Sequence, residues 1–208
     1  MALVKQTGWQ LALKRAIDRV AGAAGLVAAS PVLAATALAI RATMGSPVLF
    51  TQPRTGYRGR AFDVIKFRTM RHATGPDGAP LPDMERLTKL GAFLRSTSLD
   101  ELPQLLNVLR GELSLVGPRP LMHKYAPLYT PAQRRRFEVV PGMTGWAQIN
   151  GRNAQDWPTK FRLDVWYVEH WSLWLDLKIL GLTAIRVLQR SGVSSSATET
   201  MPEFRGES

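Results

Sequence analysis

The sequence contains no cysteine and only three histidines, and these absences exclude several kinds of chemistry. Without cysteine there is no disulfide, no thiolate nucleophile and no cysteine-based zinc or iron–sulfur site. The histidines, His72, His123 and His170, are too scattered for a histidine-rich metal motif. Any metal would therefore be a hard cation held by carboxylates and phosphates.

Acidic residues are also scarce, with 16 Asp and Glu against 27 Lys and Arg, which gives a formal net charge of +11. Such a balance favours a polyanionic neighbour: nucleic acid, an anionic membrane surface or phosphorylated substrates. Charge alone does not choose among them. The length of 208 residues fits one domain, or a small domain with an extra element, and is ample for a hydrophobic core.

Charge is absent from residues 20–40, a stretch of 21 residues rich in Ala, Val and Leu. As a straight helix this stretch would extend about 31 Å, which matches the hydrocarbon core of a bilayer. A cleaved signal peptide has a similar plan, but this stretch is longer than a usual apolar signal region. The sequence therefore predicts one membrane segment.

Ser30-Pro31 lies at the centre of this segment, where proline removes a backbone donor and bends a helix. Basic residues lie on both flanks, including Lys14 before the segment and Arg41 after it, so they give no strong orientation. One arrangement is a kinked helix that spans the membrane. The other is a re-entrant hairpin of two half-helices with both ends in the cytoplasm. The length of the segment and its flanking charges are compatible with both arrangements.

The rest of the chain predicts an α+β fold that is mainly helical. Two short extended stretches, residues 47–50 and 62–67, flank a turn-rich segment and predict a β-hairpin. Residues 73–83 predict a surface loop. Helical apolar spacing recurs in three later segments: residues 87–94, 105–109 and much of 161–188. The composition from residue 191 onward predicts a loosely held tail.

Aromatic residues crowd into 18 positions near the C-terminus, with charged residues between them: Trp157, Phe161, Trp166, Tyr167, Trp171 and Trp174. A stripe of aromatic residues commonly packs into a core. Amphipathic aromatic rings also favour the headgroup level of a membrane. Because a membrane segment lies upstream, we expect these residues to lie in the membrane interface.

The adjacent carboxylates Asp100-Glu101 lie between arginines and are the strongest candidates for chemistry. A structural explanation exists, since Ser98 and Glu101 have the spacing of a helix capping box. Pro103 is comfortable only in the first turn, so the helix should begin near Asp100. This places the two acids where unpaired N–H groups and the helix dipole attract anions.

An ionised aspartate at such a position is a competent nucleophile toward a sugar diphosphate, and its attack would form an acyl phosphate. Arg95 and Arg119 could bind phosphoryl oxygens through charge-assisted hydrogen bonds. Mg²⁺ held by Asp100 and Glu101 could offset the charge of the leaving group. Glu101 could be a metal ligand or could orient the nucleophile, and the sequence does not separate these roles.

Two further segments are candidates for the same site. Lys66-Phe67-Arg68 closes the second predicted strand with two cations, although a solvated strand end is the simpler interpretation in isolation. Residues 140–153, which include Arg152, are rich in turn residues and polar amides. Loops of this composition often bind ligands, and a plain structural turn explains it equally well.

Taken together, these segments resemble the bacterial sugar transferase family, the monotopic phosphoglycosyl transferases, and especially its small members of the type that begins N-linked protein glycosylation. The resemblance runs along nearly the whole chain in order and spacing. Its motifs are Lys14-Arg15-Ala-Ile-Asp18, Ser30-Pro31, Phe50-Thr-Gln52 with Gly56, Lys66-Phe-Arg-Thr-Met70, Arg95-x-x-Ser98-Leu-Asp100-Glu101-Leu-Pro103-Gln104, Gly117-Pro-Arg-Pro120, Pro141-Gly-Met-Thr-Gly145 and Asn150-Gly-Arg-Asn153.

The resemblance implies three parts: a re-entrant membrane helix within residues 1–45, broken at Ser30-Pro31; a compact catalytic part with interfacial amphipathic helices in residues 46–190; and a tail, residues 191–208. It implies that the protein lies on the cytoplasmic face of the bacterial inner membrane. The partners implied are membrane lipids and phosphorylated substrates rather than nucleic acid. It says nothing of oligomeric state.

For the reaction, the resemblance implies transfer of a phosphosugar from a UDP-sugar to undecaprenyl phosphate, with release of UMP, as the first membrane step of glycoconjugate biosynthesis. Asp100 is then the covalent nucleophile beside Glu101, Mg²⁺ is required, and the donor is expected to be an acetamidosugar. The substrate-binding or phosphate-binding positions are Lys66, Arg68, Arg95, Arg119 and Arg152. The competing hypotheses are a non-catalytic basic module that binds anionic lipid or nucleic acid, and a Mg²⁺-dependent phosphohydrolase.

Overall fold

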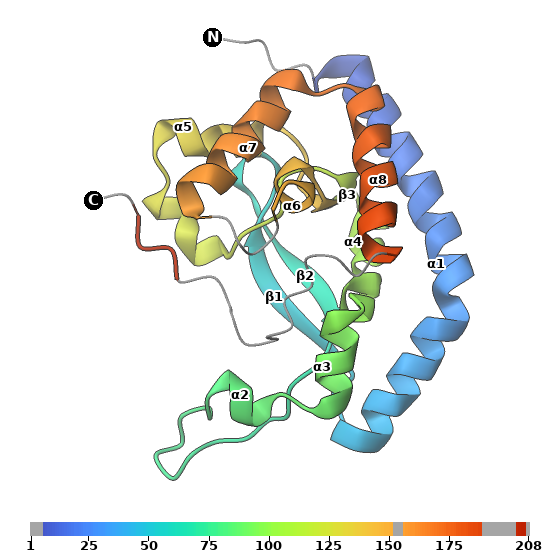
Figure 1. Cartoon of the computed structure of the whole chain (residues 1–208), viewed down its shortest axis with the longest axis vertical. Coiled ribbons are helices and arrows are strands. Elements are labelled where there is room, and N and C mark those ends of the chain that lie inside the picture. The colour runs from blue at the N-terminus through green and yellow to red at the C-terminus, as the bar shows by residue number, and fades with distance from the viewer. Residues whose placement is uncertain (1–5, 152–155, 189–202, 207–208) are drawn as a thin grey trace.

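The computed structural model describes residues 6–151, 156–188 and 203–206. This part of the chain is mainly helical, with two small sheets, as predicted (Figure 1). In chain order the elements are α1 (Gly8–Met44), β1 (Leu49–Thr55), η1 (Tyr57–Gly59), β2 (Ala61–Phe67), α2 (Asp83–Arg86), α3 (Lys89–Ser96), η2 (Leu99–Gln104), α4 (Leu105–Arg110), β3 (Ser114–Val116), η3 (His123–Leu128), α5 (Pro131–Arg134), η4 (Arg135–Glu138), β4 (Gly142–Thr144), α6 (Trp146–Ile149), α7 (Trp157–His170) and α8 (Leu173–Leu188).

The predicted hairpin is present, and its first strand is longer than expected. Strands β1 and β2 pair antiparallel, with Leu49 opposite Phe67 and Thr55 opposite Ala61. Pro53, which we expected in the turn, lies within β1 opposite Asp63. A strand of a two-stranded sheet has one free edge, so a residue without an N–H group is tolerated there. The hairpin extends from α2 and α3 at one end of the molecule to its centre (Figure 1).

The second sheet consists of two short parallel strands, β3 and β4, with Ser114 opposite Gly142 and Val116 opposite Thr144. The backbones approach so closely that a Cβ atom on Gly142 would lie 2.0 Å from the nitrogen of Gly117. Only glycine allows this contact. The sheet therefore fixes the start of the segment Gly117-Pro-Arg-Pro120, which leads into the candidate site.

Helix α1 is continuous for 37 residues through Ser30 and Pro31, so the expected break into two separate half-helices is not present. Its second half turns toward α3, and both halves pack on the same body (Figure 1). In the first half, Gly22 lies against Val108 of α4; in the second half, Ile40 is fully buried in a cluster with Phe67. The path of this helix relative to a bilayer, and the division into three parts, stay predictions.

Among the described residues, α1 is the one helix long and apolar enough to cross a membrane. Only 11% of its most apolar 18-residue window is buried in the protein. Large apolar side chains such as Val20, Val27 and Leu38 are more than two-thirds exposed. An apolar surface of this length calls for a lipid or protein covering.

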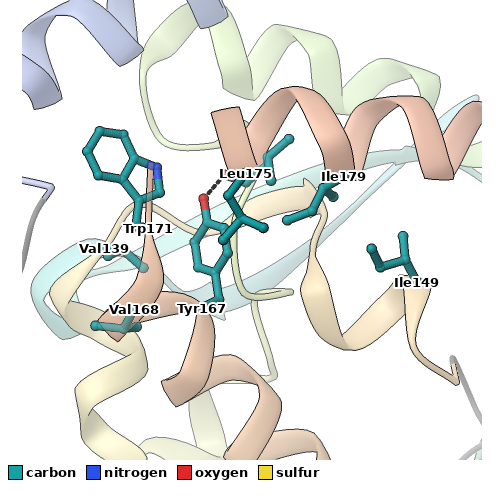
Figure 2. Close-up of a cluster of buried hydrophobic side chains, with 8 residues drawn as sticks. Val139, Ile149, Tyr167, Val168, Trp171, Leu175 and Ile179 are labelled. Carbon is teal, nitrogen blue, oxygen red and sulfur yellow. Dashed lines mark hydrogen bonds between the residues drawn. The ribbon is translucent and has the colours of Figure 1, made fainter. Parts of the chain in front are cut away.

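The main core joins α7 and α8 to the second sheet, as Figure 2 shows for Tyr167, Val168, Leu175 and Ile179. Our expectation that the clustered aromatic residues lie in the membrane interface is wrong for three of them. Phe161, Tyr167 and Trp171 are at most 3% exposed. The packing of α7 directs these rings inward, and the two with polar groups find a buried hydrogen-bond acceptor.

That acceptor is Asp176 of α8, which receives hydrogen bonds from Tyr167 Oη at 2.6 Å and Trp171 Nε1 at 3.1 Å. Lys14 of α1 completes the group, with its Nζ 2.5 Å from Asp176 Oδ2. Lys14 is only 2% exposed, so it is not a freely solvated charge beside the apolar segment. This buried ion pair joins the long N-terminal helix to α8.

An exposed apolar face is present on α8 instead of α7. Trp174 is 75% exposed and Leu177 is 59% exposed, and Ile185 and Val187 are about half exposed further along the helix. In Figure 1 α8 runs beside the first half of α1. The two helices therefore offer neighbouring apolar surfaces.

The predicted tail is not loosely held throughout. Phe204 is 4% exposed and lies in an aromatic cluster with Tyr125, Tyr129 and Phe161. The neighbouring Glu203 forms an ion pair with Lys124. Composition did not reveal this contact, because a single aromatic residue in a polar segment gives no periodic pattern.

Candidate active site

The acid pair lies in η2, a 3-10 helix that continues directly into α4. Ser98 precedes it in the left-handed conformation, with φ of 58°, and its side chain makes no capping hydrogen bond. The capping box is therefore not formed. The helix begins at Leu99, close to the predicted start at Asp100, and Pro103 lies near the end of η2, just before α4. Glu101 is free of a capping role and its carboxylate faces other partners.

Those partners are two cations. Lys66 Nζ lies 2.7 Å from Glu101 Oε1. Arg119 binds both oxygens, with Nη2 at 2.5 Å from Oε1 and Nη1 at 3.2 Å from Oε2. Burial alone would raise the pKa of Glu101, but the charges of Arg119 and Lys66 outweigh it and hold this pKa far below the ordinary value. Glu101 is therefore ionised and fixed.

Asp100 has the opposite character. It is 8% exposed, and among the described residues no hydrogen-bond donor contacts its carboxylate. Burial and the adjacent negative charge of Glu101 raise the pKa of Asp100 to about 6, while Lys66, Arg119 and Arg95 oppose the shift. Two neighbouring acids with pKa values pushed apart commonly have separate chemical roles. The two acids of this pair therefore differ in their protonation behaviour and in their contacts.

The hairpin and the helix that carry these groups are joined by a buried amide. Asn107 of α4 donates from Nδ2 to Asp63 O at 2.8 Å and accepts from Ile65 N at 3.0 Å. Asn107 is fully buried. It therefore fixes β2, and with it Lys66, against the helix that follows the acid pair. Asn107 was not predicted from the sequence, because one amide on an apolar helix face gives no distinctive pattern.

The other predicted binding residues divide into three groups. Arg95 Nε donates to Thr69 Oγ1 at 3.1 Å, and its charge acts on Asp100. Arg68 binds three carbonyl oxygens at the end of α1, those of Met44, Gly45 and Ser46, at 2.5 to 2.9 Å. Its guanidinium thus has a structural contact, and it is not brought to Glu101. Arg152 lies outside the described residues.

The surroundings of Arg119 include residues that we did not predict. Arg136 of η4 donates to Arg119 O at 2.6 Å and pairs with Asp164 of α7, with 2.8 Å between Nη2 and Oδ2. Arg136 and Asp164 are almost completely buried. This pair fixes the backbone of the segment that presents the Arg119 guanidinium. Its members are 28 positions apart in the sequence, so no local pattern indicated it.

The residues fit a hard divalent cation in part. Asp100 offers free carboxylate oxygens, whereas both oxygens of Glu101 are bonded to cations. No group of three His, Asp or Glu side chains in the described segments has metal-binding geometry. Mg²⁺ commonly uses one or two carboxylates and completes its shell with phosphate oxygens and water. Asp100 with a bound diphosphate meets that requirement; Glu101 does not while its ion pairs persist.

The fold and the site define a small, mainly helical protein with one long apolar helix and an acid pair set among buried cations. Residues 9–190 match the family model described as "Bacterial sugar transferase". The chain belongs to the bacterial sugar transferase family, and the resemblance predicted from its motifs is confirmed.

Individual relatives support the same family, and some of them are named for a reaction. The "Uncharacterized sugar transferase EpsL" of Bacillus subtilis (strain 168) is 53% identical over 194 residues, which cover 93% of this chain and 96% of that protein. The "Undecaprenyl-phosphate glucose phosphotransferase" of Komagataeibacter xylinus is 43% identical, across 86% of this chain and 36% of that protein. The "UDP-glucose:undecaprenyl-phosphate glucose-1-phosphate transferase" of Escherichia coli (strain K12) is 42% identical, across 84% of this chain and 40% of that protein. The chain thus matches less than half the length of these last two relatives.

Proposed function

We propose that this chain transfers a phosphosugar from a UDP-sugar to undecaprenyl phosphate and releases UMP. Relatives whose printed names describe this reaction match 84% to 86% of the chain. The observation that carries the proposal is the contrast within the acid pair. Glu101 is neutralised by Lys66 and Arg119, whereas Asp100 is desolvated and without a hydrogen-bond donor in the described part of the chain.

The reaction has two displacements at one phosphorus atom. A carboxylate oxygen of Asp100 attacks the phosphorus bonded to the sugar, the bond from that phosphorus to the bridging oxygen breaks, and UMP leaves with the electron pair. An oxygen of undecaprenyl phosphate then attacks the same phosphorus, and the carboxylate of Asp100 leaves. The products are UMP and a polyprenyl diphosphosugar. Because UMP leaves before the lipid reacts, the kinetics are ping-pong.

Within this scheme Glu101 is a positioning residue. Its carboxylate holds the ammonium of Lys66 and the guanidinium of Arg119 beside Asp100. Both cations lower the pKa of Asp100 and so favour the ionised nucleophile. They also supply charge-assisted donors for phosphoryl oxygens, which stabilise the charge that develops during transfer.

We further propose that Mg²⁺ is held by Asp100 and the diphosphate oxygens, without Glu101 as a ligand. When bound, the ion supplies charge neutralisation for the leaving diphosphate. This proposal differs from the expectation from the sequence, in which both Asp100 and Glu101 bind the metal. The support is the bonding of both Glu101 oxygens to cations.

For the membrane, we propose a re-entrant α1 with the catalytic part on the cytoplasmic face of the inner membrane. The support is that Gly22 and Ile40, on either side of Pro31, pack on one body. Contact of both halves with one body favours an arrangement in which both ends of the helix lie on the same side of the bilayer. The exposed face of α8, which includes Trp174 and Leu177, then lies at the interface.

The test is a screen for UMP release by purified full-length protein with Mg²⁺ and undecaprenyl phosphate. The donors are UDP-glucose and UDP-galactose, which appear in the names of relatives, and the UDP-acetamidosugars that the resemblance suggests. We expect turnover with at least one donor only when the lipid is present. A phosphohydrolase would release phosphosugar to water without lipid, and a non-catalytic module would release no UMP from any donor.

A further inference from the structure

The guanidinium of Arg54 is half-buried beside Arg119 without a carboxylate partner among the described residues. Its Nη2 donates to Gln52 Oε1 at 2.5 Å and its Nη1 to Pro120 O at 3.4 Å, and both acceptors are neutral. Burial and the charge of Arg119 lower the pKa of Arg54 to about 10. Arg54 and Arg119 are thus two neighbouring positive charges, and the hydrogen-bond acceptors of Arg54 are neutral. Such an arrangement favours the binding of an anion.

Strand register gives Arg54 the same face as the predicted phosphate-binding lysine. In the hairpin, Arg54 lies opposite Phe62 and Lys66 lies opposite Phe50, so both project to one side of the sheet. The two positions are about 13 Å apart along the strands. Arg54 also forms a bridge with Met122, just beyond Pro120. It therefore lies on the Arg119 side of the site, away from Lys66.

A second cation approaches the same side from α7. Lys160 is one helical turn from Asp164, so the two share a face of the helix. Asp164 pairs with Arg136, which binds the backbone oxygen of Arg119. The ammonium of Lys160 also lies 5.3 Å from the centre of the Trp157 ring. Lys160 therefore lies on the side of α7 that carries Asp164, whose partner Arg136 binds the backbone oxygen of Arg119.

The charges near Lys160 support this placement. Burial lowers the pKa of Lys160 to about 8, against the attraction of Asp164. Repulsion from Arg119, Arg136 and Arg54 adds to the shift. Three arginines and one carboxylate therefore act on Lys160, and a bound phosphate would add a second anion to this group. The carboxylate of Glu101 already forms ion pairs with Lys66 and Arg119.

We propose that Arg54 and Lys160 form a subsite for the phosphate attached to the nucleoside, so that the phosphate of the leaving UMP is bound there. The inference rests on the proposed function. The sugar-bearing phosphorus must lie at Asp100, near Lys66 and Arg95. The second phosphate of the donor then falls on the far side of Arg119, whose charge acts on both Asp100 and Arg54. Arg119 thus lies between the two phosphates.

The experiment measures UMP binding to full-length protein by isothermal titration calorimetry, together with the KM for the active UDP-sugar. In Arg54→Gln and Lys160→Met we expect the Kd of UMP and the donor KM to rise about tenfold or more, as for loss of a charge-assisted hydrogen bond. We expect kcat to change less than threefold. Arg54→Lys and Lys160→Arg should recover part of the affinity, and thermal unfolding checks that each variant folds.

Matched controls remove exposed cations nearby: Arg60→Gln at the hairpin turn and Arg162→Gln on α7. These should leave UMP binding unchanged. Arg95→Gln should impair turnover while changing the Kd of UMP less than threefold, because Arg95 lies at the other phosphate. Unchanged UMP binding in folded Arg54→Gln and Lys160→Met would overturn the subsite. If UMP binding depends on Arg54 and Lys160 but no UDP-sugar turns over, the subsite stands and the proposed transfer fails.

Discussion

The guanidinium of Arg119 binds both carboxylate oxygens of Glu101, at 2.5 Å from Nη2 to Oε1 and 3.2 Å from Nη1 to Oε2. Lys66 shares the first oxygen at 2.7 Å. Glu101 is thereby held as an anion, whereas no hydrogen-bond donor among the described residues contacts the carboxylate of the adjacent Asp100. On the proposed function, this contrast makes Asp100 the nucleophile and Glu101 the positioning residue.

Substitution Glu101→Gln tests the positioning role. An amide keeps the shape but leaves two half-buried cations without an anion, so we expect a loss of about 1–3 kcal/mol in the free energy of unfolding. We expect kcat to fall about a hundredfold, because Lys66 and Arg119 lose their fixed positions beside Asp100. Chemical denaturation and steady-state kinetics measure the two effects. If Glu101 were instead a required metal ligand, excess Mg²⁺ would restore activity, which we do not expect.

The raised pKa of Asp100 predicts a pH dependence of activity. With a pKa of about 6, the carboxylate is protonated below that pH and cannot attack. We expect kcat/KM for the donor to fall about tenfold per pH unit below pH 6 and to level off above it. A rate that is flat between pH 5 and pH 7 would contradict the assignment of this pKa to the nucleophile.

The raised pKa of Asp100 also predicts that its ionised carboxylate lowers the free energy of unfolding. The ordinary pKa of 3.8 applies to Asp100 in the unfolded chain, so the folded protein binds more protons between about pH 4 and 6. Stability contributed by this group is present below pH 4 and is lost as the pH rises through 6. The free energy of unfolding of Asp100→Asn should therefore be about 2–3 kcal/mol higher than that of the parent at pH 7.5. At pH 4 the two proteins should differ little. Asp63→Asn, at an exposed strand position, is the matched control at both pH values.

The ion pair between Lys14 and Asp176 predicts that α1 stabilises the catalytic part. Lys14→Met leaves the buried carboxylate without its cation, and we expect a loss of about 3 kcal/mol in the free energy of unfolding. Lys89→Met, at an exposed position, is the matched control. The double variant Lys14→Met with Asp176→Asn should lose less than Lys14→Met alone, because the carboxylate of Asp176 is then no longer buried without a cation. Part of the loss should remain, since Asp18 also lies 3.8 Å from Lys14 Nζ and is buried. Equal losses in the two variants would argue against a specific pair.

The re-entrant path of α1 is testable because the chain has no cysteine. Single cysteines at Thr7 and Thr74, both exposed, mark the two sides of α1 in the sequence. We expect both to be shielded from an impermeant thiol reagent in intact cells and both to react after lysis. Labelling of the Thr7 position alone in intact cells would establish a spanning helix.

The sequence predicted the features that depend on local pattern. The long apolar helix, the hairpin and the helices near residues 87–94 and 105–109 follow from periodicity and turn residues, and all are present. The position of the acid pair at the start of a helix followed from Pro103. These signals are local, because each depends on residues within one turn or one strand.

What the sequence did not predict depends on contacts between distant segments. The burial of Tyr167 and Trp171 depends on Asp176 and Lys14, which lie on other helices. The capture of Arg68 by carbonyl oxygens at the end of α1 likewise required the fold. The pairing of Glu101 with Lys66 rather than with Ser98 joins residues 35 positions apart. Pattern alone does not distinguish such partners.

The most direct test of the central claim is detection of the covalent intermediate on Asp100. Full-length protein is incubated with the active UDP-sugar and Mg²⁺ without undecaprenyl phosphate, and its intact mass is measured. We predict that the mass rises by one phosphosugar in the parent protein, that the adduct is lost when undecaprenyl phosphate is added, and that Asp100→Asn never forms it. An adduct of the same yield in Asp100→Asn, or turnover of that variant at the parent rate, would contradict the account.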